Sequence, residues 1–137
     1  MDGMDAVPER DAIDPQYRWD LTSIYADGDR WEAAVDTVEP LIQAVAAGEG
    51  DVGTSGVRLL EILETREQMG RRLEQLGSYA LLRAAEDTRD QSAQAMKARI
   101  AQIRTEAASA ASYLRPELIA LSDATLGAFI DEEPALR

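Results

Sequence analysis

The chemistry open to this chain is limited to carboxylates, hydroxyls and arginines, because its 137 residues include no histidine and no cysteine. That composition excludes an HExxH zinc site, a Cys/His cluster, a Ser-His-Asp triad and a thiol nucleophile. Carboxylates do acid–base work only where they converge in a pocket, whereas opposite charges three or four residues apart form surface pairs. The densest charged run has this helical spacing and comprises Glu61, Glu64, Glu67, Glu74, Arg58, Arg66, Arg71 and Arg72. It predicts a solvated helix face, and no catalytic, cofactor-binding or metal-ligating residue is assigned.

Three smaller features also have a simpler structural interpretation. The acidic turn at residues 87–90 suggests a cation binder, but it lacks the spacing and glycine of a calcium loop, so a helix cap is favoured. The glycine-rich stretch 48–56 lacks the GxxxxGK[ST] pattern that cradles phosphate. Aromatic side chains that could stack on a ligand are more often used to bury an arm against helices; they are Tyr17, Trp19 and Tyr25.

The charge balance argues against nucleic acid and membranes as partners. There are 26 acidic residues against 14 basic ones, a net charge of -12, which repels phosphate backbones and anionic lipid. Lys97 is the one lysine among the basic residues. An acidic, arginine-rich composition fits adaptation to concentrated salt, and codon bias towards arginine is the rival explanation. Unfolding measured against KCl separates the two: stability that does not rise with salt would contradict the halophilic hypothesis.

No leader-like start and no apolar run of roughly 20 residues is found, so the sequence predicts a soluble, cytoplasmic protein. Residues 1–16 have prolines and acids but no apolar period. Apolar residues nearly alternate over 17–25, which suggests a strand, but an isolated strand has no partner, so an irregular segment anchored by its aromatics is favoured. Residues 1–26 are therefore predicted to form an extended acidic and aromatic arm. Residues 27–137 predict a helical domain. Because much of its apolar content is alanine, we expect long, thin helix packing.

The first predicted helix begins at Asp29, with Asp29 as N-cap and Glu32 as its reciprocal partner. Pro40 should kink it because proline lacks an N–H and crowds the carbonyl of Asp36. Gly48 and Gly50 should end it. Its apolar stripe repeats at alternating steps of four and three, and the members are Trp31, Val35, Val38, Ile42 and Val45.

A second helix, capped by Thr54 or Ser55, is predicted to run to about Glu86. Small residues recur every seven positions at Gly70, Gly77 and Ala84, which suggests either a closely packed neighbouring backbone or a kink at Gly70. Its expected inward face comprises Leu59, Leu63, Met69, Leu73, Leu76 and Ala80.

A third helix, capped by Asp90 or Ser92, is predicted to reach about Leu114. A short connection between two long amphipathic helices predicts an antiparallel hairpin. Pro116 suits the first position of a further short helix, and Ser122 caps another one that bears Leu126, Phe129 and Ile130. The predicted fold class is therefore all-α: a long antiparallel helical hairpin with shorter helices, bundle-like.

Three ordered stretches carry a resemblance to a known family. They are Val7-Pro8-Glu9-Arg10 through Tyr17-Arg18-Trp19-Asp20-Leu21 to Tyr25, with Trp31 following; residues 78–90; and Pro116-Glu117-Leu118 with Glu133-Pro134. Together they resemble the amino-terminal region of oligoendopeptidase F, in the thimet-oligopeptidase-like group of zinc metallopeptidases. The resemblance implies helical endopeptidases that cleave short oligopeptides in a deep channel, with zinc held by HExxH and a later glutamate.

None of those zinc-binding or catalytic residues carries over, because the sequence lacks histidine. The resemblance therefore implies a non-catalytic N-terminal helical domain that helps to wall the substrate channel and is inactive alone. The resemblance implies that this segment needs no cofactor and that zinc is bound elsewhere in the parent enzyme. The implied partners are the C-terminal catalytic domain of the parent enzyme and the oligopeptide substrate. We expect the isolated piece to expose an apolar surface and to self-associate.

The alternative hypothesis is a free-standing interaction module whose alanine- and glycine-lined face docks a partner helix. The first hypothesis predicts a gene that continues beyond Arg137 into a HExxH-encoding region. The second predicts a stop codon nearby.

Overall fold

The described part of the protein is a bundle of helices built on one long hairpin. The computed structural model describes residue 25 and residues 28–86 and 89–137. It contains no strand in those ranges, and the elements are α1 (Gly28–Asp36), α2 (Val38–Ala46), α3 (Gly56–Glu86), α4 (Gln91–Ala110), α5 (Leu114–Ile119), α6 (Asp123–Glu132) and the short 3-10 helix η4 (Pro134–Leu136). This arrangement confirms the predicted all-α hairpin with shorter helices.

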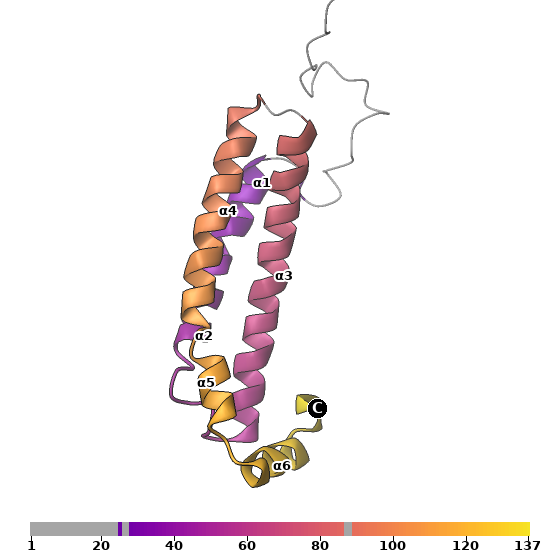
Figure 1. Ribbon diagram of the computed structural model, residues 1–137. Coiled ribbons are helices and arrows are strands. Elements are labelled where there is room, and N and C mark those ends of the chain that lie inside the picture. Colours follow the sequence, from indigo (N-terminus) through magenta and orange to yellow (C-terminus); the bar gives the residue numbers. More distant parts are fainter. Residues whose placement is uncertain (1–24, 26–27, 87–88) are drawn as a thin grey trace, which may run out of the picture.

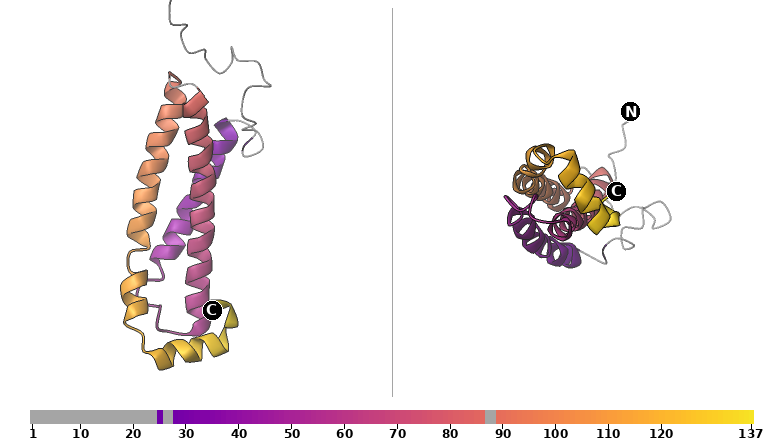
Figure 2. Two further views of the ribbon diagram at one scale, coloured as in Figure 1. Left: turned by 45° about the vertical axis from the view of Figure 1, so that its right-hand side comes forward. Right: turned by 90° about the horizontal axis from the view of Figure 1, so that it is seen from below.

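A second layer of helices packs against the long hairpin, and a further helix closes one end. Helices α3 and α4 run antiparallel beside each other, and α1 and α2 lie behind them in Figure 1. Helix α6 crosses the end of the bundle where α3 begins, as the view from below in Figure 2 shows. Residues 1–24 and 26–27 lie outside the described residues, so the predicted arm and its boundary at residue 26 stay predictions.

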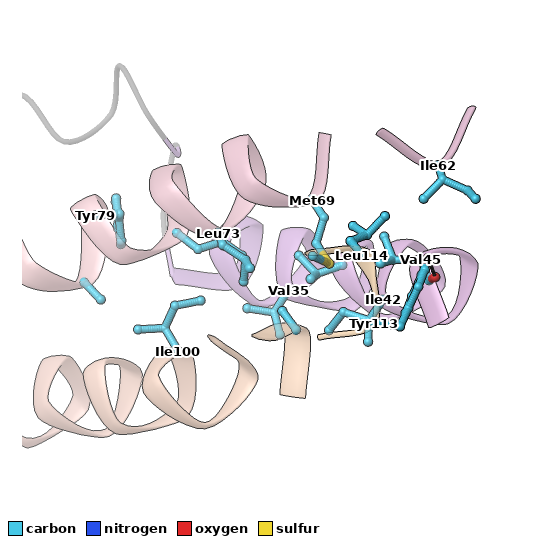
Figure 3. Packing of buried hydrophobic residues seen from close by; sticks show 14 of the residues in the cluster. Val35, Ile42, Val45, Ile62, Met69, Leu73, Tyr79, Ile100, Tyr113 and Leu114 are labelled. Atoms are coloured by element: carbon cyan, nitrogen blue, oxygen red, sulfur yellow. Dashed lines mark hydrogen bonds between the residues drawn. The ribbon is translucent and has the colours of Figure 1, made fainter. Parts of the chain in front are cut away.

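The predicted stripe of the first helical stretch is buried in full. Trp31, Val35, Val38, Ile42 and Val45 all belong to the core, and several of them are seen facing α3 and α4 in Figure 3. Trp31 has no exposed surface, and its indole Nε1 donates to the carbonyl oxygen of Leu76 at 3.0 Å. That bond ties α1 to the middle of α3.

The kink expected from Pro40 appears as a one-residue interruption of the helix three residues earlier, at Thr37. The stretch divides into α1 and α2 at Thr37, whose backbone N–H donates to Ala34 at 3.1 Å and whose hydroxyl donates to the same carbonyl oxygen at 2.6 Å. Pro40 has no N–H for the carbonyl of Asp36, so one i to i+4 hydrogen bond is missing at this point.

The predicted cap at Asp29 was wrong. Helix α1 begins at Gly28, which places Asp29 inside the first turn. Glu32, the expected capping partner, instead forms an ion pair with Arg99 of α4. Pairing with an arginine on another helix therefore replaces the reciprocal bond at the helix start.

Helix α3 begins where its cap was predicted. The Ser55 hydroxyl accepts from the backbone N–H of Arg58 at 3.0 Å. The expected inward face is buried except for Leu63, which is half-buried, while the neighbouring Ile62 is fully buried. The face is rotated because Ile62 packs at Gly48, where a Cβ would lie only 2.8 Å from its Cγ1.

The prediction of a neighbouring backbone along the glycine row was wrong. A Cβ at Gly70 would meet nothing within 4 Å, and the neighbour at Gly77 is the guanidinium of Arg104. Helix α3 continues without interruption through both glycines.

Helix α4 is capped by Asp90, whose side chain accepts from the backbone N–H of Ala93 at 3.1 Å. The helix ends at Ala110, short of the predicted Leu114, and a turn follows before α5. This turn allows the Tyr113 hydroxyl to donate to the carbonyl oxygen of Val45, at the end of α2. Pro116 occupies the third position of α5 and not the predicted first. The third position still belongs to the first turn of a helix, where backbone N–H groups have no acceptor within the helix, so proline is tolerated there.

Because the Tyr113 hydroxyl is buried, we expect the free energy of unfolding to depend on pH in the alkaline range. Burial, with the nearby carboxylate of Glu117, raises its pKa above the ordinary value of 10.0. A raised pKa favours the neutral form in the folded state, so this contribution is complete below about pH 10 and is lost as pH rises through the folded pKa. We expect urea unfolding to show Tyr113→Phe about 1 kcal/mol less stable at neutral pH. The variant should also lose less stability than the parent chain between about pH 9 and 11; equal losses would contradict the prediction.

The final helices close the end of the bundle. The Ser122 hydroxyl accepts from the backbone N–H of Thr125 at 3.1 Å, as the predicted cap requires, and Phe129 is buried. The Glu132 carboxylate accepts from the backbone N–H of Gly56 at 3.3 Å, which joins the end of α6 to the start of α3. The short helix η4 was not predicted.

Candidate functional site

The charged face of α3 consists of surface pairs and not of a catalytic pocket. Arg58 bridges Asp51 at 3.2 Å and Glu61 at 3.3 Å, and Arg71 pairs with Glu67 at 2.5 Å. The hydrogen bonds to Asp51 and to Glu67 raise the pKa of Arg58 and of Arg71 respectively. The four glutamates of the run are all exposed and are distributed over several turns of α3, so the structure does not bring them together in a pocket.

The acidic turn between α3 and α4 serves the helices. Residues 87 and 88 lie outside the described residues. Asp90 caps α4 and pairs with Arg83 at 3.1 Å, so its carboxylate already has two partners. Within the ranges that the structure describes, no three acidic side chains gather closely enough to hold a metal ion.

Tyr25, the one aromatic residue of the predicted arm that the structure describes, packs on α3. The ring of Tyr25 meets that of Tyr79 edge to face, with centroids 5.4 Å apart, and the Arg83 guanidinium lies 5.9 Å from the Tyr79 centroid. Burial raises the pKa of Tyr25. Tyr17 and Trp19, the other predicted members of the cluster, lie outside the described residues.

A wide, open groove lies along the α3–α4 hairpin, and we call it the hairpin groove. Met69, Leu73 and Ala107 lie at its base and are already buried in the core, while Gly70 and Ala108 are exposed at its edges. The complete lining consists of Arg66, Glu67, Met69, Gly70, Arg71, Leu73, Glu74, Arg104, Ala107, Ala108 and Ala111.

Two arginines of the hairpin groove lack carboxylate partners in the described part of the chain. Arg104 lies over Gly77 and donates to the carbonyl oxygen of Leu73 at 3.4 Å, a long contact, and Arg66 makes no ion pair there. Sequence reasoning placed Arg66 on a solvated face and did not consider Arg104. The available signal was an arginine at the edge of the apolar stripe, one residue after Ile103.

Comparison with known proteins finds bacterial peptidases. Group B oligopeptidase PepB of Streptococcus agalactiae is 30% identical over 128 residues, which cover 93% of this chain and 21% of that protein. Oligopeptidase PepF of Bacillus subtilis is 28% identical over 131 residues, 96% of this chain and 20% of that protein. A plasmid-encoded oligoendopeptidase F of Lactococcus lactis is 24% identical over 129 residues, which cover 93% of this chain and 22% of that protein. This chain is a relative of oligoendopeptidase F. The resemblance in the sequence is thereby confirmed.

The relation to oligoendopeptidase F extends through nearly all of this chain but only part of its relatives. The chain spans about a fifth of the length of the curated relatives that it matches. No family model and no solved structure matches it. The peptidase activity in the relatives' names belongs to those longer proteins.

The described helices of this oligoendopeptidase F relative include none that is long and apolar enough to cross a bilayer. Helix α3 has the length, with 31 residues, but charged side chains lie along its exposed face.

Proposed function

We propose that this chain is the non-catalytic helical part of a longer, cytoplasmic, oligoendopeptidase F-like zinc metallopeptidase, where it helps to wall the channel that admits short oligopeptides. The observation that carries the proposal is the coverage of the match. It includes 93% to 96% of this chain but only 20% to 22% of the three relatives compared above. A helical segment that matches these longer peptidases along nearly its whole length fits a structural role in such an enzyme.

The residues of this chain do not fit a zinc ion. The sequence has no histidine or cysteine, and the described carboxylates form no group of three. Zinc prefers imidazole, thiolate and a few converging carboxylates. We therefore assign the hydrolytic chemistry to polypeptide outside these residues and no catalytic step to this chain.

A peptidase assay tests the proposal directly. The purified 137-residue chain should hydrolyse internally quenched oligopeptides no faster than a buffer blank, with or without added zinc, because it has no histidine or cysteine to hold the ion. PepF of Bacillus subtilis, assayed in parallel, is the positive control. It should cleave the same peptides. Zinc-dependent turnover by the pure chain would contradict the proposal.

The gene provides the second test. A reading frame that continues past the codon for Arg137 into a region encoding HExxH supports the proposal. A stop codon directly after it would overturn the proposal and favour a free-standing interaction module.

A further inference from the structure

Helix α5 and the two residues after it are apolar on two opposite sides. Residues 114–121 contain two charged side chains, Arg115 and Glu117. The Glu117 carboxylate already accepts from the backbone N–H of Gly50, at 3.0 and 3.1 Å from its two oxygens. The inner side packs against the core with Leu114, Leu118 and Leu121. A surface helix normally has one polar side, whereas a helix that is apolar all round is normally buried.

The outer side of α5 has no cover in the described part of the chain. The spacing of Pro116, Ile119 and Ala120 places them together on this side, and all three are exposed. Ile119 is 75% exposed, more than any other large apolar side chain that the structure describes. Helix α5 lies between the ends of α4 and α6 (Figure 1), and none of the other described helices packs extensively on it. It is therefore a helix with one covered and one uncovered apolar side.

The size of the uncovered side indicates which kind of occupant can bind it. Two separate chains that form a stable complex normally bury about 800 Å² each, and three side chains are too few to supply that area. A segment of the same polypeptide needs a smaller contact, because the covalent link gives it a high effective concentration. A covalently linked occupant is therefore favoured over a second copy or an independent partner.

We propose that the outer side of α5 is covered by an apolar surface of the polypeptide that completes the longer peptidase, with Ile119 as the main buried side chain of the contact. This inference rests on the proposed function and adds the place where this part of the enzyme meets the rest. The length of the relatives supports it, because the matched part is only 20% to 22% of the three compared above. The occupant is apolar because Pro116, Ile119 and Ala120 offer it no charge.

Hydrogen exchange tests the inference on two proteins, the 137-residue chain and the full-length enzyme encoded by the continued reading frame. Both are measured at concentrations where sedimentation shows monomers. The amides of residues 114–121 should exchange at least about tenfold more slowly in the full-length enzyme, because a helix covered on both sides opens less often.

Two variants of Ile119 show whether this protection comes from the proposed contact. Ile119→Gln introduces a polar side chain with good helix propensity, and Ile119→Leu is the matched control that stays apolar. In the 137-residue chain, each should change the equilibrium constant for unfolding by less than about twofold, because the side chain is mostly in water. In the full-length enzyme, Ile119→Gln should remove most of the extra protection of residues 114–121, whereas Ile119→Leu should keep it.

Three results would overturn the inference. They are equal exchange of residues 114–121 in the two proteins, protection in the full-length enzyme that survives Ile119→Gln, and protection that is found only where the full-length enzyme is a dimer. The last result would make a second copy the occupant. A stop codon directly after the codon for Arg137 would end both proposals, whereas equal exchange in a full-length enzyme that cleaves oligopeptides would end this inference alone.

Discussion

Replacing Trp31 by alanine should lower the free energy of unfolding by about 3–5 kcal/mol. Trp31 has no exposed surface and packs among side chains of α2 and α3, so the truncation removes the largest buried side chain and leaves a cavity. It also removes the hydrogen bond from the indole Nε1 to Leu76. Since domains of this size are stable by only about 5–15 kcal/mol, the loss is a large share of the total.

Urea unfolding followed by circular dichroism measures this loss. Trp31→Phe is the matched control, because it keeps an aromatic ring in the core but cannot donate to Leu76. The Leu76 carbonyl lies within α3, where helical hydrogen bonding still satisfies it, so this variant should lose clearly less stability than the alanine variant. A loss below about 1 kcal/mol for Trp31→Ala would mean that α1 contributes little to the core.

Replacing Gly56 by alanine should detach α6 from the start of α3, at a cost of about 1–3 kcal/mol. A Cβ at this position would lie 2.8 Å from the backbone oxygen of Phe129 and 3.1 Å from its Cα. Backbone atoms cannot rotate away as a side chain does, so α6 must move. The movement also weakens the hydrogen bond from Gly56 to Glu132.

Hydrogen exchange and urea unfolding together measure this effect. Amides of α6 should exchange faster in the Gly56→Ala variant, whereas those in the middle of α3 should keep their protection. Gly70→Ala is the matched control in the same helix: it adds a Cβ into open space, so it should stabilise the chain by about 0.5–1 kcal/mol. Unchanged exchange of α6 in the Gly56 variant would contradict the packing described for these two helices.

Periodicity predicted the helices well because one face of each is buried by large side chains. The stripe from Trp31 to Val45 and the caps at Ser55, Asp90 and Ser122 were read from local sequence, and each depends on residues within a few positions of one another. Such local features need no knowledge of the rest of the fold.

The errors arose where a distant contact decided the local structure. Ile62 replaces Leu63 in the core because Gly48, on another segment, leaves room for it. Helix α4 stops early where Tyr113 reaches the carbonyl of Val45. In both places the deciding neighbour is remote in the sequence, so periodicity within one helix contains no sign of it.

The hairpin groove could not be predicted for the same reason. Arg66 and Arg104, which have no carboxylate partner among the described residues, come from different helices. Whether they face the same groove depends on the register between α3 and α4, which the sequence of either helix alone does not determine. Charge spacing along α3 suggested an exposed face, which is correct for its glutamates and for Arg66, but it contained no sign of the groove beside them.

The interruption at Thr37 is a single residue that keeps right-handed helical dihedrals, φ -79° and ψ -14°. Helix α1 packs mainly on α2 and α3, whereas α2 packs on both α3 and α4. The missing N–H of Pro40 thus removes one backbone hydrogen bond without parting the two halves of this stretch, and both remain seated on the long hairpin.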